Sequence, residues 1–178
     1  MKPLLRRLLI ALAGLLAFPF HSHAITPSSP VITQGTVYRV IDGDTYVVNV
    51  DDAAFARFQA AAGKDRRRNR YLDPRFNSIR VRLANVDTPE SVHANPKMNT
   101  QAGRDASVAV KRLIQGKQVE VRCHDWGQYG RSICNVLLGG SDVGLWLIQQ
   151  GHSEYVSRWG KNPYMHREYT QAMRQQGR

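Results

Sequence analysis

Two short acidic segments of the sequence carry residue types that can bind a divalent cation. In the first, Ile-Asp-Gly-Asp-Thr, Asp42 and Asp44 are separated by one glycine within strand-like sequence. Acids and glycine are poor strand formers, so a bulge at the glycine could aim a carboxylate away from the sheet. An Asp-Gly pair is equally typical of a tight hairpin turn, and the sequence leaves both interpretations open.

The second segment, Val-Asp-Thr-Pro-Glu, occupies residues 86–90 at the end of a strand-like run. Pro89 removes one amide donor and keeps Thr88 extended, which leaves the Thr88 carbonyl without a helical partner. Ca²⁺ takes oxygen ligands from carboxylates, carbonyls and water. Asp44, Asp87 and the Thr88 carbonyl would form part of a calcium shell, which water and a substrate phosphate would complete. The alternative is a plain strand end followed by an acid that starts a helix.

Two arginines are placed where they could bind phosphate oxygens. Arg82 lies on the polar face of an alternating strand, shortly before Asp87, and Arg131 follows Tyr129 and a glycine where a hairpin returns. A guanidinium group offers a planar fork of donors that matches a phosphate. Either arginine taken alone could equally be a solvated surface charge.

In chain order, these segments resemble the staphylococcal nuclease family. The resemblance rests on Asp-Gly-Asp-Thr, then Arg-Leu-Ala-Asn-Val-Asp-Thr-Pro-Glu, then Tyr-Gly-Arg, and it runs from about Gly35 to Trp159. It implies a calcium-dependent enzyme that hydrolyses phosphodiester bonds of DNA and RNA and leaves 3′-phosphates. It also implies an α+β fold, in which a five-stranded OB-type β-barrel carries three helices.

The resemblance further implies a role for each residue of the site. Three residues would bind the calcium ion: Asp44, Asp87 and, through its carbonyl, Thr88. Glu90 would be the general base that activates the attacking water. Arg82 and Arg131 would hold the phosphate, and Tyr129 would lie against the substrate. This chemistry needs no serine or cysteine nucleophile.

A segment after the second predicted strand departs from the family pattern. Residues 51–78 are expected to form an insertion, which begins with an alanine-rich helix that ends at Gly63. Its basic run at residues 64–70, KDRRRNR, has five positive charges and one negative charge. This run is either a solvated loop or an added contact to phosphates, so the insertion could extend the binding groove or shield it.

Two further departures concern residues near the expected substrate. Gln128 precedes Tyr129 where the family has lysine, which removes one positive charge. After Gly151 the likeness loosens, and either Tyr155 or Trp159 could be the second aromatic residue that contacts substrate.

The elements that position these residues follow from periodicity and capping residues. Strands are expected at residues 36–50 (as two strands or one bent strand), 78–86, 118–123 and 131–138. Helices are expected at residues 51–63, 101–114, 142–150 and 163–174. This order favours an α+β fold whose small, mostly antiparallel sheet closes into a barrel.

Residues 1–24 are typical of a secretory signal peptide. A charged start precedes an apolar run, and Ser-His-Ala offers small residues at the cleavage positions. The apolar run is shorter than the ~20 residues that span a bilayer, although an uncleaved anchor is the alternative. Residues 25–34 would then be a linker and residues 35–178 the nuclease-like domain. The expected destination is a periplasm or the medium, with no stable membrane insertion after cleavage.

The two cysteines of the chain, Cys123 and Cys134, flank a turn-like stretch between two strand-like runs. An even number of cysteines in an oxidising compartment favours pairing, and cross-strand placement would bring the Cβ atoms close. We expect a structural disulfide that stabilises the fold by roughly 2–4 kcal/mol. Two free buried thiols are the alternative.

Composition and charge limit the possible classes of protein. With 178 residues, of which 42% are hydrophobic, the chain suits one compact domain and is neither collagen-like nor wholly disordered. Its 25 Lys and Arg residues against 14 Asp and Glu give a net charge of +11, which favours nucleic acid as partner, ahead of an anionic membrane. DNA and RNA are thus the expected substrates, and no protein partner is predicted.

Two other classes compete with a nuclease. One is a non-catalytic OB-type module that only binds nucleic acid, and the other is an exported module that binds anionic wall polymers. The acids and arginines argue against the first, because a binding module has no use for a water-activating acid beside a phosphate. The second predicts polyanion binding that is indifferent to EDTA and no cleavage of strands.

Overall fold

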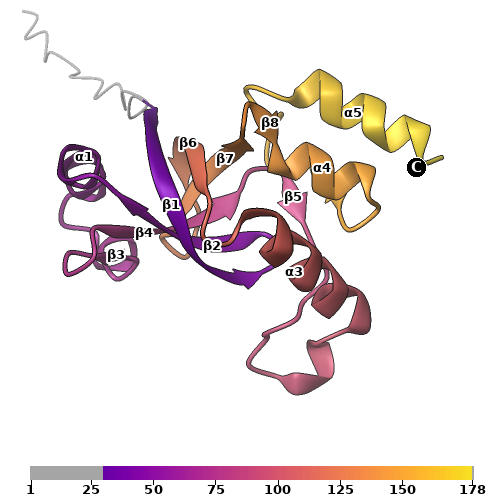
Figure 1. Ribbon diagram of the computed structural model, residues 1–178, viewed down its shortest axis with the longest axis horizontal. Helices are drawn as coiled ribbons and strands as arrows, with labels where there is room; N and C mark the ends of the chain where they lie inside the picture. The colour runs from indigo at the N-terminus through magenta and orange to yellow at the C-terminus, as the bar shows by residue number, and fades with distance from the viewer. Residues whose placement is uncertain (1–29, 178) are drawn as a thin grey trace, which may run out of the picture.

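Five long strands close into a barrel, and Figure 1 shows helices packed around it. The computed structural model describes residues 30–177. The expected signal peptide and residues 25–29 of the expected linker lie outside this range. The barrel strands are β1 (Val31–Asp42), β2 (Thr45–Val50), β4 (Ser78–Leu83), β6 (Gln118–Trp126) and β7 (Ser132–Leu138). Parallel pairing of β4 with β7 closes the otherwise antiparallel barrel, so the expected α+β fold with an OB-type barrel is confirmed.

The other elements are short strands and helices. The short strands are β3 (Leu72–Asp73), β5 (Val86–Asp87), β8 (Ser141–Asp142) and β9 (Glu154–Tyr155). The helices are α1 (Asp52–Ala62), α2 (Arg66–Asn69), α3 (Gln101–Ile114), α4 (Val143–Gln149), α5 (His166–Gln175) and the 3-10 helix η1 (Pro96–Met98). The helices α1, α3, α4 and α5 correspond to the four that periodicity and capping residues predicted. Within residues 30–177, none of the helices has the length and apolar character needed to cross a membrane.

Alternate residues of the strands fill the barrel interior. Val37, Val48 and Val81 have no exposed surface, and α3 adds the fully buried side chains of Val110 and Ile114. Burying one such side chain contributes roughly 1.5–3 kcal/mol relative to leaving it exposed. Because a slip of one residue would turn these side chains outward, the core fixes the register of the strands that carry the site.

Local capping residues set the ends of the first long helices. The Asp51 side chain accepts a hydrogen bond from the Ala54 amide at the start of α1, and Gly63 ends this helix with a φ of 57°. Thr100 caps α3 by accepting from the Gly103 amide. The bounds predicted for both helices are confirmed, because caps and periodicity are properties of neighbouring residues.

Two predicted boundaries are wrong. β1 begins at Val31 and pairs with β6 from its first residue, so residues 31–34 belong to the barrel rather than to a linker. α5 begins at His166 rather than at Pro163. Asn162 accepts hydrogen bonds from two amides that follow it, so it caps the turn before α5 and not the helix itself.

A disulfide bond joins β6 to β7, as the sequence predicted. Cys123 and Cys134 lie directly opposite each other in the antiparallel pair, and both are buried. The bond therefore ties together the two strands that lead into the turn before Arg131.

The segment between β2 and β4 is folded and rests on the barrel. α1 packs against β1 and β4 and buries Phe55 and Phe58. α2 carries part of the basic run and lies against the β6–β7 turn, where a Cβ atom on Gly130 would come within 2.3 Å of the Arg67 carbonyl group. The basic run is thus held beside the turn that contains Tyr129 and Arg131.

Candidate active site

The turn between β1 and β2 places the first acidic segment inside the molecule. Gly43 and Asp44 form a two-residue turn, across which Asp42 pairs with Thr45. The hairpin interpretation is therefore correct, and it is the turn that aims the Asp44 carboxylate. Only 5% of the Asp44 surface is exposed.

The second acidic segment contacts Asp44 through Thr88. The Oδ2 atom of Asp44 accepts hydrogen bonds from the Thr88 amide at 3.0 Å and from the Thr88 hydroxyl at 3.1 Å. A Cβ atom on Gly43 would lie 2.6 Å from Thr88 Oγ1, so this close approach requires glycine. The sequence did not predict this contact, which joins residues 44 positions apart.

Arg82 links the two carboxylates that were predicted to bind metal. Its Nη1 atom lies 3.0 Å from Asp44 Oδ2, and its Nη2 atom lies 2.8 Å from Asp87 Oδ1. Nη1 also donates to the Val86 carbonyl. These ion pairs bring both carboxylates to one guanidinium group, whereas the sequence predicts only a phosphate-binding role for Arg82.

Burial dominates the electrostatics of Asp44. The pKa of its carboxyl group is raised to about 6, chiefly because burial removes solvent. The Arg82 charge opposes this rise, and the charge of the nearby Asp42 contributes to it. The charge of Asp44 therefore depends on its partners, which is common among carboxylates at functional sites.

The donor atoms of the site fit a hard divalent cation. Asp44 and Asp87 offer carboxylate oxygens on either side of the Arg82 guanidinium group, and oxygen is the ligand that Ca²⁺ and Mg²⁺ prefer. Across the described part of the chain, no group of three or more His, Cys, Asp or Glu side chains could hold a metal ion. Water or the oxygens of a ligand would have to complete the shell.

Glu90 lies at the edge of this cluster, and its backbone is held firmly. The Glu90 carbonyl accepts a hydrogen bond from the Thr100 amide at 2.9 Å. α3 approaches so closely that a Cβ atom on Gly103 would lie 2.2 Å from the same carbonyl oxygen. Glu90 is exposed, and none of the residues at 30–177 pairs with its carboxylate. A fixed backbone with an unpaired carboxylate suits a group that must accept a proton.

Arg131 reaches the buried acid through an intermediate hydroxyl group. Its Nη1 atom donates to Thr45 Oγ1 at 3.2 Å, and that hydroxyl donates to Asp44 Oδ1 at 3.1 Å. Tyr129, two residues earlier, is 58% exposed in the β6–β7 turn. The structure thus connects five of the predicted residues, Asp44, Arg82, Asp87, Thr88 and Arg131. The side chains of Glu90, two residues after Thr88, and of Tyr129, two residues before Arg131, are exposed.

The two aromatic residues considered after Gly151 have different surroundings. The Tyr155 hydroxyl is hydrogen-bonded to His166 Nδ1 at 2.8 Å, and its ring packs edge-on against Tyr169. Trp159 is 71% exposed, and the Arg158 guanidinium lies 4.0 Å from its ring centroid. Arg158 also lies 3.8 Å from Asp87, so Trp159 is the aromatic residue that faces solvent near the acids.

The closed five-stranded barrel defines an OB-type fold, and its charged site joins a buried acid, Asp44, and an exposed acid, Asp87, through one arginine. The family model described as staphylococcal nuclease homologue matches residues 80–177. The chain belongs to the staphylococcal nuclease family. Residues 1–79, which include the insertion, lie outside this match.

Curated relatives agree with this family. The chain is 26% identical to a probable staphylococcal-like nuclease CAN1 of Oryza sativa subsp. japonica, over 64% of this chain but 30% of that protein. It is also 26% identical to an uncharacterized endonuclease of Escherichia coli O157:H7, over 74% of this chain and 66% of that protein. The chain therefore spans less than a third of the length of the plant relative.

Proposed function

We propose that this protein is an exported, calcium-dependent nuclease that hydrolyses phosphodiester bonds of DNA and RNA. One observation carries the proposal: Arg82 joins the acids of two separate segments, Asp44 and Asp87. Glu90, three residues after Asp87, has an exposed carboxylate. Membership of the nuclease family and the names of the relatives support the same activity.

Four residues would bind the metal ion or activate the attacking water. Asp44, Asp87 and the Thr88 carbonyl would hold Ca²⁺, which neutralises charge on the phosphate when it is bound. The Thr88 amide and hydroxyl fix the Asp44 carboxylate in position. Glu90 would take a proton from the attacking water and hold that water in line with the leaving oxygen.

The arginines would stabilise the negative charge that develops on the phosphorus oxygens. Arg131 keeps donors available, because its one side-chain partner within the described range is the neutral hydroxyl of Thr45. Preorganised donors of this kind are worth about 2.7–4 kcal/mol each in the transition state. Arg82 would add a second guanidinium group, and Tyr129 and Trp159 offer exposed rings to the bases.

A cleavage assay tests the activity and its metal requirement together. The chain lacking residues 1–24 would be incubated with plasmid and with single-stranded DNA and RNA, in Ca²⁺ or in EDTA. Calcium-dependent shortening of the polynucleotides is expected. Binding that ignores EDTA and never breaks a strand would instead favour a non-catalytic module or a wall-polymer binder.

Export is proposed from residues 1–24, and the Cys123–Cys134 bond suits an oxidising compartment. Expression of the full chain in a bacterial host, followed by fractionation and N-terminal sequencing, tests this step. A mature chain that begins near residue 25 outside the cytoplasm is expected. An intact Met1 in the cytoplasmic fraction would contradict it.

A further inference from the structure

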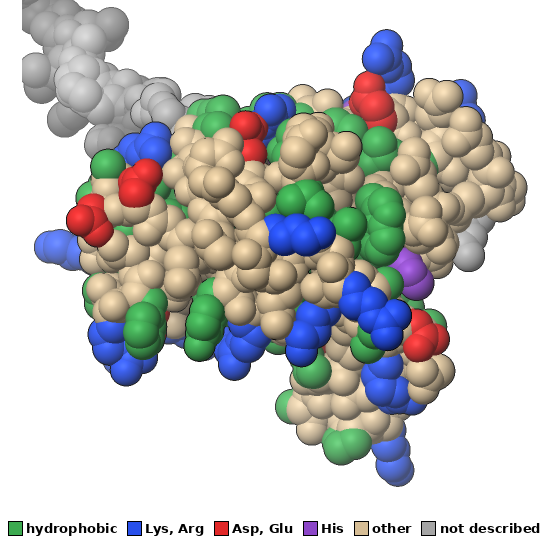
Figure 2. Space-filling model, in the orientation of Figure 1, with side chains coloured by type: hydrophobic (Ala, Val, Ile, Leu, Met, Phe, Trp, Pro, Cys, Tyr) green, Lys and Arg blue, Asp and Glu red, His purple; other side chains and the backbone are tan. Residues whose placement is uncertain are grey.

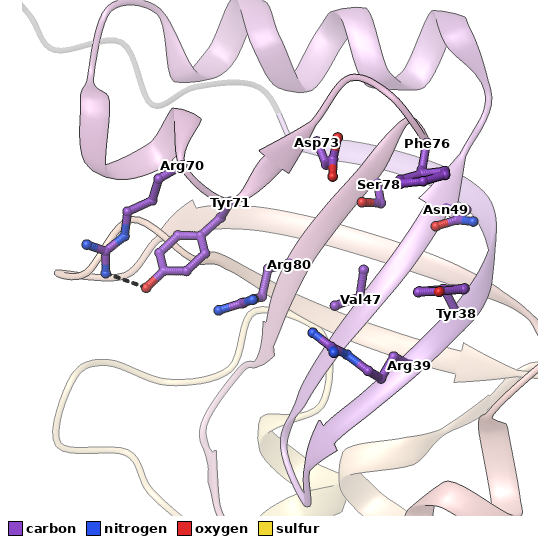
Figure 3. Close-up of a pocket in the computed structure, with 10 residues that line it drawn as sticks. All are labelled: Tyr38, Arg39, Val47, Asn49, Arg70, Tyr71, Asp73, Phe76, Ser78 and Arg80. Atoms are coloured by element: carbon purple, nitrogen blue, oxygen red, sulfur yellow. Dashed lines mark hydrogen bonds between the residues drawn. The ribbon is translucent and has the colours of Figure 1, made fainter. Parts of the chain in front are cut away.

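An open groove of about 250 Å³ crosses the outer face of the barrel beside the candidate active site. Figure 3 shows its lining side chains, which come from β1, β2, β4 and the end of the insertion. Six of these side chains are aromatic or cationic: Tyr38, Tyr71, Phe76, Arg39, Arg70 and Arg80. Of the six, Arg80 alone falls within residues 80–177, the region that the family model matches.

Two large rings stand exposed at one end of the groove (Figure 3). An irregularity in the β1–β2 pairing lies between Val37 and Arg39, and it leaves both Tyr38 and Arg39 on the outer face. Tyr38 is 67% exposed, and Phe76 is 65% exposed. Exposed rings contribute little to the stability of the fold, but a flat ligand could stack on them.

The other end of the groove has an excess of positive charge. The Arg70 and Arg80 guanidinium groups lie 4.6 Å and 4.9 Å from the centroid of the Tyr71 ring. Burial lowers the pKa of Arg80, and the positive charges of Arg39, Arg131 and Arg70 lower it further. Arg70 and Arg80 thus lie against the same ring, and an anion bound between them would reduce the repulsion between their charges.

The groove contains little negative charge to oppose these arginines. Among its described lining residues, Asp73 is the one acid, and Arg75 binds its carboxylate at 2.8 Å. Figure 2 shows basic and hydrophobic side chains interleaved along the lower edge of the molecule, on the side of β3. Interleaved cationic and aromatic side chains are typical of surfaces that bind single-stranded nucleic acid.

The groove leads directly to the candidate active site. Ser78, Arg80 and Arg82 alternate along β4 and share its outer face. The first two belong to the groove, and Arg82 belongs to the acid cluster about 7 Å further along the strand. On the neighbouring strand β2, Asn49 and Val47 line the groove, and Thr45 bonds to Arg131. A strand held at the reacting centre could therefore continue across this face.

We propose that this groove binds the single-stranded portion of the substrate that extends from the cleavage site, with bases stacked on Tyr38 and Phe76 and phosphates between Arg39, Arg70 and Arg80. The inference rests on the proposed nuclease function and specifies its substrate as unpaired polynucleotide. Bases within a duplex already stack on one another, so exposed rings favour a strand whose bases are free.

A binding experiment in EDTA separates the groove from cleavage. The probe is a fluorescent 12-nucleotide oligothymidylate, and the variant is the double substitution Tyr38→Ala with Phe76→Ala. We expect its Kd to rise at least tenfold, because stacking on two rings together is typically worth more than this. Tyr38→Phe should restore most of the loss from Tyr38→Ala. Both rings are largely exposed, so a melting curve like that of the native chain is expected.

Arginine variants test the electrostatic part of the groove. Arg70→Ala should weaken oligonucleotide binding and reduce the slope of log K against log salt concentration by about one. Arg112→Ala is the matched control, because Arg112 is exposed on α3 and lines no part of the groove. Equal losses in the two variants would overturn a specific role for Arg70, since they would reflect net charge alone.

The cleavage arm compares two substrates in Ca²⁺. The groove variants should lower kcat/KM at least tenfold for the oligonucleotide, and they should leave it unchanged for a nitrophenyl phosphodiester of thymidine, which is too short to reach Tyr38 and Phe76. Unchanged oligonucleotide binding by the double variant would overturn the proposal that the groove binds substrate. Tighter binding of duplex than of single-stranded DNA would also overturn it. Native protein that binds the oligonucleotide through the groove but cleaves no substrate would overturn the proposed nuclease activity and support the proposed binding by the groove.

Discussion

At the scale of single residues, the candidate site depends most on one unpaired carboxylate. Glu90→Gln keeps the size of the side chain but removes its ability to accept a proton, so kcat should fall by ~10²–10⁴-fold, the usual range for loss of a general base. Steady-state cleavage of single-stranded DNA in Ca²⁺ measures this fall. Because Glu90 is exposed, the melting temperature and the oligonucleotide Kd in EDTA should match those of the native chain. A native rate in the variant would remove Glu90 from the proposed role.

The sequence could indicate which residue types form the site but not how they pair. Asp44, Asp87 and Arg82 were recognisable because acids and arginines at strand ends are unusual and matched a family motif. Their ion pairs depend on how the β1–β2 turn meets β4, which is a contact between distant segments. The packing of Thr88 on Gly43 is non-local in the same way. Periodicity and caps contain no information on such contacts, so the structure was needed to find them.

At the scale of elements, the disulfide bond supports the strands that lead into the Arg131 turn. Closing a loop of this size should stabilise the fold by about 2–4 kcal/mol, chiefly by restricting the unfolded chain. Urea unfolding with and without a reducing agent measures the difference as a change in midpoint. A variant with Cys123→Ser and Cys134→Ser is the control, and its midpoint should not respond to the reducing agent. Identical midpoints for the native chain in both conditions would contradict a stabilising bond.

The docking of α2 on the β6–β7 turn gives a second prediction at this scale. Gly130→Ala adds a Cβ atom 2.3 Å from the Arg67 backbone, so α2 must move away from the turn that holds Arg131. Gly139→Ala is a matched control, because Gly139 also has a positive φ but has open space around its Cβ position. Both variants should lose roughly 1–2 kcal/mol from backbone strain. Proteolysis should then cut the basic run faster in Gly130→Ala alone, and equal cleavage rates would argue against the docking.

At the scale of the whole molecule, calcium binding and folding should be linked. An ion that binds only the folded chain adds about 2.7 kcal/mol of stability at 100 times its Kd, which is about 5–10 °C in melting temperature for a chain of this length. Thermal unfolding in Ca²⁺ and in EDTA measures this shift. Asp87→Asn removes one proposed ligand charge from a side chain that is half exposed, so the folded state should survive while the shift shrinks or disappears. Glu90→Gln should keep the shift, because Glu90 is assigned to water rather than to the metal. The two variants therefore separate metal binding from water activation: an undiminished shift in Asp87→Asn would place the ion elsewhere, and a lost shift in Glu90→Gln would make Glu90 a ligand.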